Sequence, residues 1–261
     1  MKRSSGARLC ATAAVGALSL ALITGCSSDE TKKDAKGSGD ASSSAPASSS
    51  APAAKALTKA ELEKLLLTQG EVKGYKVASG DDTLPKSKSV VKSDKAECEP
   101  IIWASGALAP GDTDVAVSNS VTEDKASTAT ADPKNLADAF DINLTFVGLS
   151  SYEGDGAEKA MKAVSDGVKA CAGGYTVTTK GEKTKVTKVA PAKGSGLGDE
   201  SVPFTENVDL DGEGTATVNG EVVRKGNTVA TFYTVNFASF STGKVAPIPP
   251  ALLQAQIAKL K

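Results

Sequence analysis

The sequence contains no histidine, and this absence excludes several kinds of catalytic site. Ser-His-Asp and Cys-His arrangements, histidine general bases and zinc sites with histidine ligands all require an imidazole. The four cysteines include no C-x-x-C pair, so a redox or metal-binding role for them is not indicated. An enzyme with this sequence would have to work with carboxylates, lysine or tyrosine.

Arginine is almost as scarce, because Arg224 is the only one beyond Arg3 and Arg8. The bidentate guanidinium contacts that grip phosphates and guanine edges are therefore nearly absent. If the N-terminal leader with Lys2 is removed, 27 basic and 31 acidic side chains remain. A mildly acidic surface does not attract nucleic acid, so we expect no nucleic-acid partner, and no motif indicates a cofactor.

Apolar runs are also missing from the chain, with one exception near its start. Residues 9–23 form an apolar stretch behind the basic residues Lys2, Arg3 and Arg8, and small residues then precede Cys26. This order is typical of a signal peptide, which would comprise residues 1–25. The alternative is an uncleaved membrane anchor, for which the stretch is shorter than the roughly 20 residues that span a bilayer.

The segment Ile23-Thr24-Gly25-Cys26 resembles the cleavage site of bacterial lipoproteins. The resemblance implies that Cys26 becomes the first residue and receives a diacylglyceryl thioether, with fatty acids such as palmitate. Two acyl chains hold a protein at a membrane far more firmly than one does. We therefore expect attachment to the cell membrane through lipid on Cys26, with the chain on the extracytoplasmic side.

Residues 26–56 are rich in serine, alanine and proline and hold no aromatic residue. Such a segment cannot bury a core, so we predict a disordered linker that spans roughly 30 Å as a flexible coil. Residues 57–261 contain all the aromatic residues of the chain and are predicted to form one extracytoplasmic domain.

Cys98 and Cys171 are the two cysteines that remain once Cys10 is removed and Cys26 is acylated. In an exported protein we expect them to form a disulfide. The alternative is two buried free thiols.

Residue patterns predict an α+β fold, an antiparallel sheet with packed helices braced by one disulfide. A capping box at Thr58 and Glu61 starts a helix that should run to about Thr68. Further helices are expected at 97–109, where Trp103 should lie in the core, and at 155–172 and 251–260. Strands are expected at 115–122, 142–148, 214–225 and 227–240, with a hairpin within 175–189.

Several short motifs resemble the extracellular sensor domains of membrane serine/threonine kinases and related actinobacterial lipoproteins. They are Leu65-Leu66-Leu67-Thr68, Cys98-Glu99-Pro100, Cys171, Gly198-Asp199-Glu200-Ser201 and Val223-Arg224-Lys225-Gly226-Asn227. The resemblance implies a cleft beside an antiparallel sheet and a ligand-sensing role without catalysis. The chain departs from those domains in lacking the cysteines for a second disulfide and an attached kinase domain.

Asp199, Glu200 and Arg224 are the candidate ligand-binding residues. Asp199 and Glu200 would face the cleft, and Arg224 would hold a carboxylate or phosphate of the ligand. The alternative for Arg224 is a salt bridge in an exposed hairpin. The acidic residues between Asp209 and Glu213 resemble part of a calcium loop but lack its full spacing, so we expect a solvated turn and no metal.

These observations predict a membrane-anchored surface lipoprotein with a non-catalytic, sensor-like domain that is not an enzyme. Its partner beyond the membrane would be an unidentified small molecule or an envelope protein. One alternative is a structural or assembly lipoprotein at the cell wall. A carboxylate-dependent hydrolase is the other, although no acid and base are clearly paired.

Overall fold

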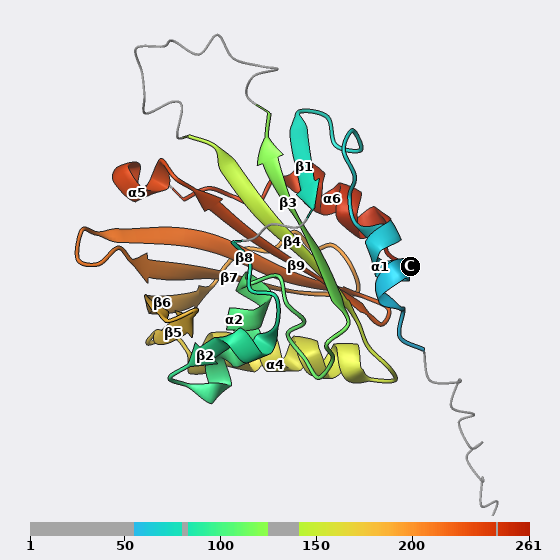
Figure 1. The fold of residues 1–261 in the computed structure, drawn as a ribbon, viewed down its shortest axis with the longest axis horizontal. Coiled ribbons are helices and arrows are strands. Elements are labelled where there is room, and N and C mark those ends of the chain that lie inside the picture. The colour runs from blue at the N-terminus through green and yellow to red at the C-terminus, as the bar shows by residue number, and fades with distance from the viewer. Residues whose placement is uncertain (1–54, 80–82, 125–140, 244) are drawn as a thin grey trace, which may run out of the picture. The chain divides into compact units, whose positions relative to one another are not determined.

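An antiparallel sheet forms the centre of the computed structural model, which describes residues 55–79, 83–124, 141–243 and 245–261. Its nine strands are β1 (Tyr75–Ser79), β2 (Val91–Ser93), β3 (Ala116–Glu123), β4 (Asn143–Ser151), β5 (Tyr175–Thr179), β6 (Glu182–Pro191), β7 (Glu200–Asp209), β8 (Thr215–Lys225) and β9 (Thr228–Asn236). They lie in the order β1-β3-β4-β9-β8-β7-β6-β5-β2 (Figure 1). The predicted α+β class with an antiparallel sheet is confirmed.

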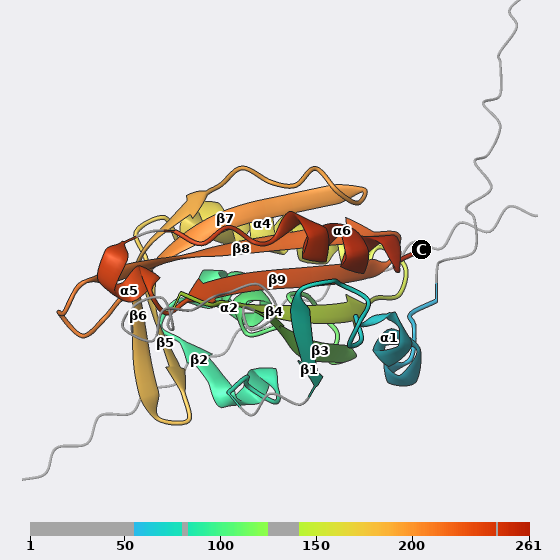
Figure 2. The ribbon, with the colours of Figure 1, turned by 90° about the horizontal axis from the view of Figure 1, so that it is seen from above.

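Helices cover both faces of this sheet. They are α1 (Lys59–Leu65), α2 (Glu99–Ser105), α4 (Gly156–Ala170), α5 (Ser239–Thr242) and α6 (Pro250–Ala258), with short 3-10 turns η1 (Lys88–Val90) and η2 (Ala96–Cys98). One core lies between the sheet and α2 with α4, where Met161 and Phe204 are buried. A second core lies on the opposite face under α1 and α6, around Leu62, Phe232 and Leu252. Figure 2 shows the sheet and these helices from a second direction.

The predicted disulfide joins the elements of the first core. Cys98 lies directly before α2, Cys171 is the C-cap of α4, and the structure bonds them to each other. Both side chains are fully buried. The disulfide therefore fixes the two helices on one face of the sheet to one another.

The capping box is present as predicted, but the first helix is shorter than expected. The Thr58 hydroxyl accepts from the backbone N–H of Glu61, and the Glu61 carboxylate accepts from the backbone N–H of Thr58 at 2.8 Å. The helix ends at Leu65 rather than near Thr68, because Leu66 has extended backbone angles. Contacts with α6, described below, account for this end.

Three strands differ from the prediction. Neither β2 nor β7 was expected, and β7 holds Pro203 in its interior, where proline is uncommon. β9 ends at Asn236 instead of continuing to residue 240. There the Asn236 side chain accepts from the backbone N–H of Ser239 at 3.2 Å, which turns the chain into α5.

Within the described ranges, no helix combines the length and the apolar character needed to cross a membrane. The predicted signal peptide, Cys26 and most of the predicted linker lie outside those ranges.

Candidate ligand-binding cleft

The structure brings Asp199, Glu200 and Arg224 together at the end of the β8–β9 hairpin. Arg224 lies 3.4 Å from the Glu200 carboxylate and 3.8 Å from that of Asp199. The other Asp199 contacts are with Lys225 at 2.9 Å and the backbone N–H of Gly226 at 2.7 Å. The Gly226 N–H, followed by Lys225, lowers the pKa of Asp199.

The charges of these three residues are thus directed at one another and at the hairpin backbone. Arg224 also donates to the carbonyl of Gly226 at 3.2 Å, and its side chain is only 17% exposed. This geometry matches the hairpin salt bridge that the sequence left open. Ligand binding by the three residues stays a prediction.

A larger feature is a cleft of about 1100 Å³ at the edge of β3. Its walls are residues 66–69 after α1, residues 84–89, residues 107–109 and the start of β3 at residues 116–119. Among the described strands, residues 116–118 of β3 pair only with β4, because the pairing with β1 begins at Asn119. The cleft therefore lies where the sheet edge is not covered by β1.

Asn119 is one of the polar residues that line this cleft. Its side-chain N–H₂ group donates to the carbonyl of Leu67 at 2.8 Å, while its oxygen Oδ1 is buried and has no hydrogen-bond partner among the described residues. The residue as a whole is 2% exposed. A buried acceptor without a donor costs free energy, and because this oxygen has almost no exposed surface it is not itself a contact point for a ligand in the cleft.

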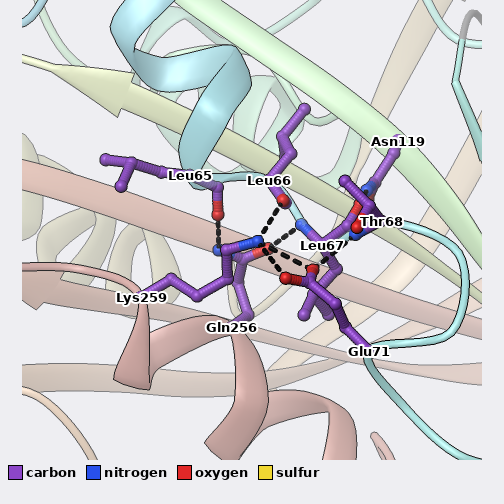
Figure 3. Close-up of polar contacts among 8 residues, drawn as sticks. All are labelled: Leu65, Leu66, Leu67, Thr68, Glu71, Asn119, Gln256 and Lys259. Atoms are coloured by element: carbon purple, nitrogen blue, oxygen red, sulfur yellow. Dashed lines mark hydrogen bonds and ion pairs between the residues drawn. The ribbon is translucent and has the colours of Figure 1, made fainter.

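The α1 side of the cleft is held by polar contacts with α6 (Figure 3). Gln256, fully buried, accepts from the N–H of Leu67 at 3.0 Å and donates to the carbonyl of Leu65 at 2.8 Å. Lys259 donates to the carbonyl of Leu66 at 2.8 Å and pairs with Glu71 at 2.7 Å. These contacts, which we call the α1–α6 latch, satisfy backbone groups that a longer α1 would have used itself.

Lys88 holds the opposite side of the cleft. Its ammonium group donates to the carbonyls of Gly111 and Thr113, the latter at 2.8 Å, and lies 4.7 Å from the centre of the Trp103 ring. Burial lowers the pKa of Lys88. Trp103 was expected in the core but is only half-buried, and the ammonium group of Lys88 lies over its ring.

Glu206 is the most enclosed carboxylate in the described structure, but it does not line the cleft. It accepts from Tyr175 at 2.6 Å, from Tyr233 at 3.0 Å and from Ser105 at 3.3 Å. Burial raises the pKa of Glu206, and burial together with this carboxylate raises the pKa of both tyrosines. Its described partners are hydroxyl groups, so no second carboxylate pairs with it as a hydrolase would require.

In the acidic turn after β7, the first carboxylate forms its contacts within the protein. Asp209 accepts from the backbone N–H of Gly212 at 3.1 Å and lies 3.6 Å from Lys185. In the described parts of the chain, no group of three or more potential metal ligands occurs.

The cleft residues escaped sequence reasoning because they come from separate segments that meet only in the fold. One signal was available at Asn119. It occupies the alternate position between Val117 and Val121, which face the same core, so a polar side chain was placed where an apolar one was expected.

Comparison with known proteins found neither a matching family model nor a matching curated protein. Two solved structures are similar. The extracellular domain of PknH from Mycobacterium tuberculosis has 16% identity and a TM-score of 0.44, and the match covers 78% of this chain and 95% of that one. A putative uncharacterized protein of Mycobacterium smegmatis has 14% identity and a TM-score of 0.30, with 77% and 94% covered. The first of these matches agrees with the predicted resemblance to extracellular sensor domains of kinases.

Proposed function

We propose that the protein is a lipid-anchored surface protein whose extracytoplasmic domain binds a small molecule in the cleft beside β3 and performs no catalysis. The observation that carries the proposal is the cleft of about 1100 Å³ itself, which lies at the uncovered edge of β3 and is lined by both apolar and polar residues. A cleft of this size matches or exceeds the roughly 300–1,000 Å³ of typical ligand sites.

The lining of the cleft favours a ligand of mixed character. Leu84, Pro85 and Val117 provide apolar surface, while Asp114 and Ser118 add polar groups that can pair with a polar group on the ligand. The walls are held in place by the α1–α6 latch and by Lys88. Such a preformed site lowers the ordering cost of binding.

The proposal is tested by native mass spectrometry of the full-length protein isolated from its own membrane. We expect a retained ligand, seen as a mass increase that disappears on denaturation. In Ser89→Trp the new ring would fill part of the cleft, so the retained ligand should be lost.

Val90→Trp is the matched control, because Val90 belongs to the same turn, is exposed and does not line the cleft. It should retain the ligand as the wild type does. The proposal fails if wild-type protein carries no ligand, or if Ser89→Trp retains it fully.

A further inference from the structure

A second, smaller cavity of about 360 Å³ lies on the face of the sheet that α6 covers. It is bounded by residues 192–195 before β7, by residues 247–254 around the start of α6, and by β7 and β8 beneath them. It shares no lining residue with the cleft beside β3. Any role of this cavity is therefore independent of the function proposed above.

Glu221 lines this cavity, and only one of its two carboxylate oxygens is hydrogen-bonded within the described structure. The residue is 3% exposed, and its Oε1 accepts from the backbone N–H of Ser195 at 2.9 Å and from the Ser195 hydroxyl at 2.7 Å. Gly194 allows this approach, since a Cβ there would lie 3.3 Å from Oε1. The other oxygen, Oε2, has no partner among the described residues.

A carboxylate buried to this degree normally has both oxygens paired, because an unpaired buried charge is costly. Oε2 is not one of the unpartnered side-chain atoms that are closed to solvent. It therefore opens to the cavity that Glu221 lines. The free oxygen is thus available to a donor that enters from outside.

Asn219 adds a second acceptor in the same cavity. It precedes Glu221 by two residues on β8, so both side chains lie on one face of the sheet. Its side-chain N–H₂ group donates to the carbonyl of Ala246 at 2.6 Å, which leaves Oδ1 as an acceptor. Pro203, Ile248 and Leu253 supply apolar walls beside these two oxygens.

We propose that this cavity binds a primary ammonium group carried on a short apolar chain. Two free acceptors and one negative charge match an ammonium, which offers only donors. Lys193, on the rim, is the only basic side chain among the described lining residues. A metal ion would need more oxygen ligands than the single carboxylate in this lining provides.

A guanidinium group fits less well than an ammonium. Its planar fork binds a carboxylate through both oxygens, but Oε1 of Glu221 already accepts two hydrogen bonds from Ser195. The cavity therefore distinguishes the two cations. The ammonium itself could belong to a free amine or to a lysine side chain.

The test is NMR titration of the full-length protein with butylammonium, N-acetyl-lysine methylamide, methylguanidinium and neutral 1-butanol. We expect saturable shifts of the Ser195 and Leu197 amide signals with one or both ammonium probes, and at least tenfold weaker binding of the other two. If only butylammonium binds, the site takes a free amine; if the lysine derivative also binds, it accepts a lysine side chain.

Glu221→Gln should weaken ammonium binding at least tenfold while keeping an acceptor for Ser195. Ser195→Ala should keep binding, because it leaves the carboxylate in place, and it serves if Glu221→Gln is unstable. Glu213→Gln, an exposed carboxylate in the β7–β8 turn, is the charge-matched control. Equal binding of 1-butanol, no saturable shift with either ammonium, or undiminished binding in Glu221→Gln would overturn the proposal.

Discussion

Glu206 shows how a single buried charge can be kept without a cation beside it. Three hydroxyl groups, from Tyr175, Tyr233 and Ser105, donate toward its carboxylate at the centre of the first core. Burial still raises the pKa of Glu206, since hydroxyl groups compensate only partly for lost water. Glu206 links strands β7, β5 and β9 with helix α2. The free-energy cost of burying its carboxylate depends on pH.

This cost can be measured as a pH dependence of stability. The folded-state pKa is raised above the unfolded value, so the stability that Glu206 contributes is fully present below about pH 4 and is lost as pH rises through the folded pKa. We expect wild type to lose stability relative to Glu206→Gln as the pH rises above about 4. Urea unfolding of both proteins checks this, and a constant difference across the range would contradict it.

Gly220 gives a second prediction at the residue scale. A Cβ at this position would lie 2.4 Å from the Phe204 ring, which is itself buried between β8 and the first core. Gly220→Ala should therefore lower the free energy of unfolding by about 1–3 kcal/mol through overpacking. Gly173→Ala, where nothing lies within 4 Å, is the control and should change stability little. Thermal unfolding distinguishes the two variants.

At the scale of elements, the α1–α6 latch sets both the end of α1 and the wall of the cleft. A single buried side chain, Gln256, satisfies one N–H and one C=O that the end of α1 leaves open. The latch thus joins residues that are far apart in the chain, near its start and its end. Its loss should affect the position of residues 66–69 before it affects the rest of the fold.

Removing the latch has a defined expected cost. Gln256→Leu leaves the buried N–H of Leu67 and the C=O of Leu65 without partners, at about 1–3 kcal/mol for each group that stays dry. Hydrogen exchange should report faster exchange of the Leu67 amide, and urea unfolding should report the loss of stability. Gln254→Leu, exposed on the same helix, should leave Leu67 unchanged.

The elements that the sequence predicted well are those with a clear period and a clear boundary. The helix near residues 155–172 and the hairpin of β8 and β9 have both, and they occur as α4, β8 and β9. β7 was missed because its sequence, which contains Pro203, does not have the local pattern of a strand. In the sheet, β7 is stabilised by pairing with β6 and β8. The early end of α1 depends on Gln256, about 190 residues away, which no local pattern reveals.

The candidate sites were less predictable because they too depend on contacts between segments that are far apart in the chain. The sequence singled out Asp199, Glu200 and Arg224 and offered a salt bridge as the alternative role of Arg224, but it did not identify the two carboxylates as the partners of this arginine. The cleft and the Glu221 cavity depend on which strand edge is left uncovered and on where residues 192–195 cross β8. These are properties of the assembled sheet rather than of any segment.

For the whole molecule, the disulfide should be the largest single covalent contribution to stability. It closes a loop between residues 73 positions apart, which the chain-entropy model values at about 4 kcal/mol. We expect the double variant Cys98→Ala/Cys171→Ala to lose about this much in guanidinium unfolding. Dithiothreitol should destabilise the wild type similarly and leave the double variant unaffected; a smaller effect in both experiments would show that α2 and α4 hold without it.

The proposed anchor is tested on whole cells. Cys26→Ser removes the sulfur that would carry the lipid, so the protein should move from the membrane fraction to the soluble fraction. Ser27→Ala keeps Cys26 and should stay in the membrane fraction. Mass spectrometry of the wild-type N-terminal peptide should show a lipid on Cys26, and an unmodified Cys26 would rule out this form of attachment.

The two outer strands of the sheet have a further consequence for contacts between copies of the protein. β1 has five residues and β2 has three, and each carries an exposed lysine, Lys76 and Lys92. Short, charged edges are poor templates for strand pairing between molecules. Copies of the protein that meet would therefore not join their sheets into fibrils through these two strands.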